Sequence, residues 1–145
     1  MRRLIPVLLV VAVFAVPASA SAALVSLRGG HGTAVLAGSG TALGLKVARG
    51  SVRITDLPRG AHTVIHVTGA EHVVRVSRRT KVYRGRDMTF TVSYGRWRVG
   101  IRGAGIDVSA SLRGRLTLRG IAGTYQIGSG PVRDWPRVRT SFFLR

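Results

Sequence analysis

Between residues 88 and 101 the sequence alternates apolar and polar side chains almost without interruption. In the first part, apolar residues occupy even positions and polar residues odd ones: Met88, Phe90, Val92 and Tyr94 alternate with Thr89, Thr91 and Ser93. From Trp97 to Ile101 the apolar residues occupy odd positions instead. A two-residue period is the pattern of a β-strand with one buried side, and it does not match the i, i+3, i+4 spacing of a helix. The stretch therefore predicts strands on both sides of a change of parity.

A two-residue turn at Gly95 and Arg96 explains this change of parity, because glycine at the first central position suits a type II′ hairpin. The expected hairpin places these pairs on one side: Tyr94 with Trp97, Val92 with Val99, and Phe90 with Ile101. The aromatic residues Phe90, Tyr94 and Trp97 are then expected in the core, and the arginines in solvent.

Glycines divide the rest of the chain into short runs rich in Val, Ile, Thr and aromatic residues, with turn signals about every 8 to 12 residues. This spacing predicts an all-β fold, an antiparallel sandwich or barrel built from short hairpins. Residues 30–54 also repeat a loose G-x-G-[ST] unit, which leaves a β-solenoid as the alternative.

The first 22 residues have the pattern of a secretory signal peptide. Arg2 and Arg3 precede an apolar run over 4–16, and small residues follow, with A-x-A sites ending at Ala20 and Ala22. The run is shorter than the ~20 residues that span a bilayer as a helix. It has no polar face, which argues against an uncleaved N-terminal helix. We therefore expect cleavage near Ala20 or Ala22, a single β-rich domain over 23–145, and a secreted or wall-associated protein.

Positive charge dominates the part of the chain that follows. Removing residues 1–22, which carry only two arginines, leaves 123 of 145 residues and a formal charge of +16 (18 − 2). The chain has no cysteine, which excludes disulfides and thiolate metal sites and fits a bacterial exported protein. Asn is absent and lysine rare, as in GC-rich coding sequences, so the choice of Arg over Lys says nothing by itself about anion recognition.

Catalytic and metal-binding patterns are weak. His62 and His66 would stand ~13 Å apart on one strand, too far to share a metal ion unless a hairpin around Gly69 adds Glu71 and His72. There is no G-x-S-x-G elbow, the stretch at 40–46 breaks the phosphate-loop pattern, and the stretch at 100–105 imitates a dinucleotide-binding fingerprint only through its abundance of glycine. An enzyme would need distant groups such as His62, His66 and Asp107 to converge. We therefore expect no enzyme, no metal and no cofactor.

The arginines expected to point outward form the candidate anion-binding set: Arg96, Arg98, Arg102, Arg113, Arg115 and Arg119. Such a basic surface attracts anions in a salt-dependent manner. For an exported bacterial protein the expected partners are anionic cell-wall polymers or an anionic membrane surface. Nucleic acid is disfavoured because the aromatics that would stack bases are assigned to the core.

Two alternative functions stay open: the arginines serve only solubility, or the chain is a structural protein that assembles through strand edges. The oligomeric state is open too.

Residues 83–120, "YRGRDMTFTVSYGRWRVGIRGAGIDVSASLRGRLTLRG", and the later "GTYQIGSGPVRDWP" carry a resemblance. Together they resemble a group of small, exported, glycine-rich proteins of actinobacteria with no assigned activity. The resemblance covers about residues 28–136, and its most specific parts are "GIDVSA" and the Trp135-Pro136 pair. It implies a β-rich secreted domain and supplies no catalytic residue.

Overall fold

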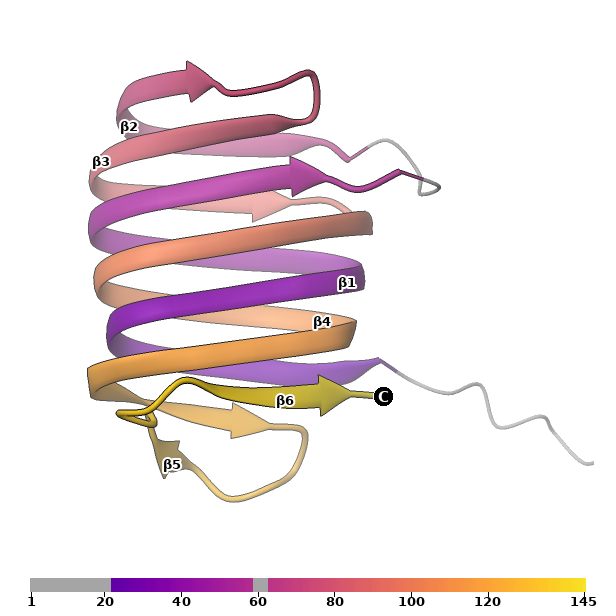
Figure 1. Cartoon of the computed structure of the whole chain (residues 1–145), viewed down its shortest axis with the longest axis vertical. Helices are drawn as coiled ribbons and strands as arrows, with labels where there is room; N and C mark the ends of the chain where they lie inside the picture. The colour runs from indigo at the N-terminus through magenta and orange to yellow at the C-terminus, as the bar shows by residue number, and fades with distance from the viewer. Residues whose placement is uncertain (1–21, 59–62) are drawn as a thin grey trace, which may run out of the picture.

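The computed structural model describes residues 22–58 and 63–145, which form one antiparallel sheet that is not closed into a barrel (Figure 1). Its strands are β1 (Ala23–Asp56), β2 (Ile65–Arg75), β3 (Thr80–Val92), β4 (Gly95–Ile127), β5 (Arg133–Asp134) and β6 (Thr140–Leu144). Their order is β2-β3-β1-β4-β5, and β6 lies beside β4. The predicted class, all-β, antiparallel and sandwich-like, is confirmed. Within the described residues, no helix is long and apolar enough to cross a membrane.

The two long strands wind around each other as a flattened coil. Ala34 of β1 lies opposite both Ile101 and Leu118 of β4, so this part of β1 runs between two successive turns of β4. Ile101 in turn lies between Ala34 and Val52 of β1, one turn of β1 apart. Each turn contributes one stretch to the front layer of Figure 1 and one to the back layer, so the two layers pack as in a sandwich.

The predicted hairpin at Gly95 and Arg96 is wrong. β3 and β4 do not pair with each other there; both lie along β1, with Val92 opposite Leu43 and Gly95 opposite Gly40. Residues 93–94 carry the chain from the back layer to the front layer, and the winding continues in the same direction. A corner between layers reverses the parity of inward positions just as a tight turn does, so alternation alone does not distinguish the two.

Glycines form the corner that β1, β3 and β4 share. Gly32 lies opposite Gly103 and Gly120, and Gly50 lies opposite Gly103 and Gly85. Gly32, Gly50 and Gly103 have φ angles of 148°, 151° and 157°, which L side chains rarely adopt. These glycines bend continuous strands, so the expected short strands joined by hairpins are replaced by β1 of 34 residues and β4 of 33 residues. The recurring corners are also the origin of the solenoid-like repeat, although every strand pair is antiparallel.

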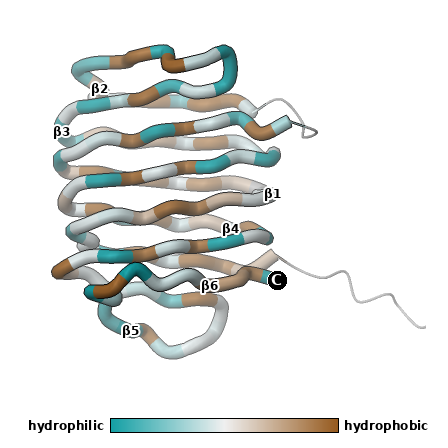
Figure 2. Tube along the Cα trace, viewed as in Figure 1, coloured by the Kyte–Doolittle hydropathy of each residue, from teal (hydrophilic) through white to brown (hydrophobic). Residues whose placement is uncertain are grey.

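The core lies between the two layers and consists of the inward residues of each alternating strand (Figure 2). Phe90 comes from the back layer and Trp97 from the front layer, and both are fully buried as expected. Tyr94 was also expected in the core, and this is wrong: its side chain is 64% exposed. It sits in the crossing between layers, outside the alternation of either strand.

Trp135 fixes the C-terminal segment against the end of the coil. Its ring occupies the space beside Gly30 and Gly120, its Nε1 donates to the carbonyl of Thr124 at 3.0 Å, and only 4% of it is exposed. We expect Trp135→Phe to lose this hydrogen bond, at about 1 kcal/mol, and also the contacts of the six-membered ring of the indole with Gly30, which raises the total cost further. Amide exchange should accelerate over residues 133–136 and stay unchanged in β1. Unchanged exchange at 133–136 would contradict the anchoring role.

Candidate functional site: an arginine-rich side of the coil

The structure brings all six predicted arginines onto the front layer, where they flank β1 in three pairs. Arg96 and Arg113 lie on either side of Ser39, Arg98 and Arg115 on either side of Ala37, and Arg102 and Arg119 on either side of Thr33. All six are exposed. Residues far apart in β4 become near neighbours because β1 runs between two successive turns of β4.

Two further arginines, which the sequence pattern did not single out, extend this surface. Arg84 of β3 lies opposite Ser51, which lies opposite Arg102 on its other side. Arg53 of β1 lies beside Gly100. Both are exposed. Outward parity could have identified each as exposed, but only the register places them beside the other six. The eight residues form the arginine face: Arg53, Arg84, Arg96, Arg98, Arg102, Arg113, Arg115 and Arg119.

The arginines of the three flanking pairs are regularly spaced and have few partners. The two arginines of a pair are two strands apart, ~9.5 Å at the usual strand separation. Within the described residues, Arg98, Arg102, Arg113 and Arg119 have no hydrogen-bond or ion-pair partner. Arg96 donates to the carbonyl of Pro58 at 3.2 Å, and the guanidinium of Arg115 lies 5.0 Å from the ring centre of Phe143.

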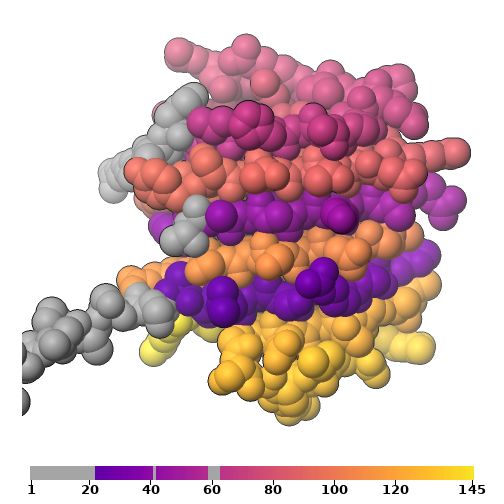
Figure 3. Space-filling view, turned by 180° about the vertical axis from the view of Figure 1, so that it is seen from behind, coloured from indigo at the N-terminus to yellow at the C-terminus, as the bar shows by residue number. Residues whose placement is uncertain are grey.

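The back layer has a different chemistry at equivalent outward positions. Figure 3 shows this side, where stretches of β3, β1 and β4 lie next to one another. Small or uncharged polar residues occupy the middle of this layer: Ser26, Ala42, Gly44, Thr89, Thr91, Ser109 and Ser111. Two cations also lie in this layer: Lys46 is opposite Asp107, and the exposed Arg28 is opposite Thr124. Most of the positive charge therefore lies on the front layer. The composition of the chain does not explain this, because composition sets the number of arginines and not the layer on which they lie.

The glycine corner adds a trough to the edge of the arginine face. A hollow of about 520 Å³ lies between Arg102 and Arg119, with His31 beside it. Gly32, Gly103 and Gly120 line it together with Thr33 and Ile121. An anionic group that enters this hollow can therefore contact both guanidinium groups.

The other candidate groups do not converge in the described part of the chain. His66 lies opposite Thr91 in the back layer, whereas His72 lies opposite Arg84 in the front layer, because β2 bends at Gly69 and makes no hairpin there. Asp107 accepts a hydrogen bond from the Gly29 amide at 2.8 Å and lies three strands from His66, about 14 Å. His62 lies outside the described residues. Over residues 22–58 and 63–145 no group of three or more His, Cys, Asp or Glu could hold a metal ion.

Comparison with protein-family models, curated proteins and solved structures finds no match to this chain.

Proposed function

We propose that this protein is a non-enzymatic, secreted or envelope-associated domain that binds anionic cell-wall polymers through its arginine face. The gathering of eight exposed arginines on one layer of the coil, opposite a layer whose middle carries mainly small uncharged residues, is the observation that carries the proposal. The signal-peptide pattern of residues 1–22 favours an envelope location.

Repulsion between neighbouring arginines favours binding of a repeating polyanion. Like charges ~9.5 Å apart lie just beyond the Debye length of physiological salt, about 8 Å, so the repulsion between adjacent arginines is partly screened there and grows as salt is lowered. A polymer that carries an anion on each repeat relieves this repulsion at several sites at once, whereas a small anion relieves it at one. Binding should therefore stabilise the fold and depend strongly on salt.

The direct test is co-sedimentation of the full chain with purified bacterial wall, before and after chemical removal of its anionic polymers. We expect binding to intact wall at low salt and its loss toward about 1 M salt, where the Debye length falls to about 3 Å. Stripped wall should not bind. Vesicles with anionic lipids form a second arm that distinguishes a membrane surface from a wall polymer. Binding that survives high salt, or that is equal on stripped wall, would overturn the proposal.

The second candidate, assembly through strand edges, has one observation in its favour. β2 is the last strand of the sheet order and has a neighbour on one side only. Three valines that are more than half exposed lie here, Val73 and Val74 at the end of β2 and Val76 just after it. An exposed, apolar edge strand is a template for pairing with another chain. Arg75, Arg78 and Arg79 flank this edge and oppose such pairing, which is why we place anion binding first.

If β2 mediates assembly, light scattering should show a mass that rises with concentration, and Val74→Lys should return the chain to a monomer. Val138→Lys adds the same charge at an exposed valine outside β2 and serves as the control. A monodisperse monomer at every concentration would exclude edge assembly.

A further inference from the structure

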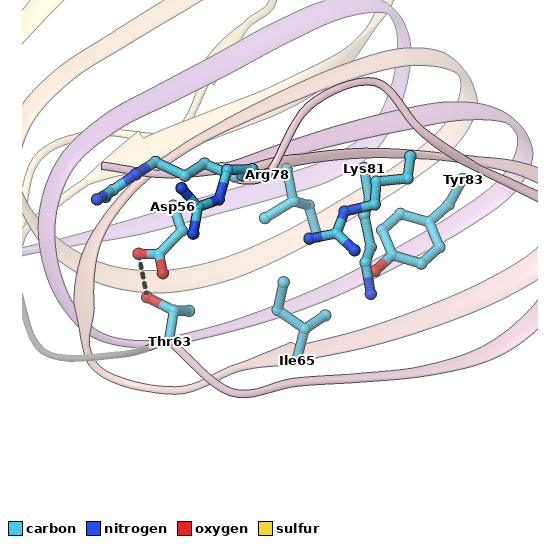
Figure 4. A pocket seen from close by; sticks show the side chains of 9 residues that line it. Asp56, Thr63, Ile65, Arg78, Lys81 and Tyr83 are labelled. Carbon is cyan, nitrogen blue, oxygen red and sulfur yellow. Dashed lines mark hydrogen bonds between the residues drawn. The ribbon is translucent and has the colours of Figure 1, made fainter. Parts of the chain in front are cut away.

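The inner space of the coil opens at its β2 end, away from the arginine pairs of β1 and β4. A hollow of about 320 Å³ lies there, lined by residues from the end of β1, from β2, and from the start of β3 with the turn before it (Figure 4). This volume corresponds to about ten water molecules at ~30 Å³ each and lies at the lower end of the range for small-molecule sites.

Two cations point into this hollow from positions that belong to the core side of the sheet. Lys81 of β3 lies directly opposite Ile54 of β1 and Arg75 of β2. Directly opposite residues in a sheet point to the same side. Ile54 is 1% exposed and faces the interior, so Lys81 and Arg75 lie on the core side of the sheet as well, but at its open end, where both side chains are exposed. The Nε of Arg75 donates to the carbonyl of Ser77 at 3.3 Å, which leaves its two terminal nitrogens for a ligand.

Beside these two cations, the hollow is lined by the hydroxyl group of Tyr83 and by apolar side chains. Tyr83 follows Lys81 by two positions on the same side and is 6% exposed, and its ring packs edge-on against Phe90 with centres 5.3 Å apart. Within the described residues its hydroxyl has no hydrogen-bond partner. Burial raises the pKa of this phenol, so the hydroxyl stays protonated and available as a donor at neutral pH. Ile65 lies across from Tyr83 in Figure 4.

The remaining charges leave the hollow strongly positive. Arg78 and Arg79 add two cations from the turn before β3, whereas Asp56 adds the one carboxylate of the described lining. Asp56 accepts a hydrogen bond from Thr63 at 3.1 Å, shown dashed in Figure 4. Four cations against one carboxylate give this lining a net charge of +3 (4 − 1). Arg75, Arg78 and Arg79 also oppose pairing of the β2 edge, but edge protection does not require them to line one hollow together with Lys81 and Tyr83.

We propose that this hollow binds a small amphiphilic anion, with a phosphate or carboxylate head held by Arg75, Lys81 and the Tyr83 hydroxyl and a short apolar group packed against Ile65. A guanidinium and an ammonium group hold such a head through charge-assisted hydrogen bonds. The apolar surface adds affinity for a ligand with an apolar group, which a free inorganic anion lacks. This site is separate from the arginine face and does not depend on polymer binding.

The test is calorimetric titration of the full chain with four probes: phenyl phosphate, benzoate, inorganic phosphate and uncharged benzyl alcohol. We expect the two aromatic anions to bind at least tenfold more tightly than inorganic phosphate, and benzyl alcohol not to bind. The ratio of phenyl phosphate to benzoate affinity distinguishes a phosphate head from a carboxylate head. Equal affinity for phenyl phosphate and inorganic phosphate, or no binding of either aromatic anion, would overturn the proposal.

Substitutions in the hollow and on the arginine face test where the small anion binds. Lys81→Gln and Arg75→Gln should each weaken phenyl phosphate binding at least tenfold, and Tyr83→Phe, which keeps the ring, should weaken it severalfold. Arg98→Gln and Arg102→Gln on the arginine face are the controls and should leave it unchanged. Circular dichroism establishes that each variant is folded. A loss in the controls as large as in Lys81→Gln would mean non-specific attraction and would refute the site, whether or not the protein binds wall polymers.

Discussion

Gly103→Ala should remove a large part of the molecule's stability in one substitution. Gly103 lies at the shared corner with a φ of 157°, which an alanine adopts only with strain. A Cβ there would also collide with the carbonyl oxygen of Arg49, so the backbone of β1 must move. Backbone strain and overpacking together predict a loss of about 3 kcal/mol or more in the free energy of unfolding.

Gly100→Ala, in the same strand, is the matched control for this corner. A Cβ at position 100 meets no atom within 4 Å. Because alanine restricts the unfolded chain more than glycine does, we expect a change between zero and a gain of about 1 kcal/mol. Urea unfolding of both variants measures the difference. If the two substitutions change the free energy of unfolding equally, the corner does not need glycine and the coil is held by other means.

Removal of three arginines from the arginine face should weaken polymer binding about a hundredfold. Each basic residue near an anionic surface contributes about 1 kcal/mol, and about 1.4 kcal/mol is a factor of ten in affinity. The variant is Arg98→Ser, Arg102→Ser and Arg115→Ser in one chain. These residues flank Ala37 and Thr33 of β1, and their loss leaves the inward positions untouched. The slope of log affinity against log salt should fall by about 3, one per lost contact.

The charge-matched control replaces three exposed arginines outside the arginine face: Arg28, Arg86 and Arg133. Both variants have the same formal charge, +15 (18 − 3), so a difference between them reports position and not total charge. The control should keep most of the affinity and most of the salt slope. Equal losses in both variants would show that net charge alone attracts the polymer, and the arginines would then serve solubility and general attraction.

The alternation of apolar and polar residues predicts well which side chains point into the core and which point into solvent. The inward positions at Phe90 and Trp97 and the outward positions of the six candidate arginines follow from a two-residue period, because each strand has one buried side. Tyr94 shows where this reasoning stops. It lies in the crossing between layers, where the period is interrupted and a residue's parity no longer tells which way its side chain points.

The partner of each strand could not be predicted from the sequence pattern. The parity change after Tyr94 favoured a local hairpin, whereas β3 and β4 both lie along β1. The decisive contacts are between residues such as Ala34 and Leu118, far apart in the chain, and nothing in a local pattern encodes them. The hollow near Lys81 could not be predicted for the same reason: its cations look like ordinary surface charges until Ile54 is seen opposite Lys81.

The sequence by itself determined that the chain is all-β, that its core is apolar and alternating, and that the six candidate arginines point outward, because these properties depend on the chemistry and period of neighbouring residues. Only the tertiary structure decided that the glycines are corners, that the arginines meet as pairs across β1, and that four cations surround one hollow. Those arrangements depend on the register between successive turns of the coil, and register is set by packing between segments that are distant in the sequence.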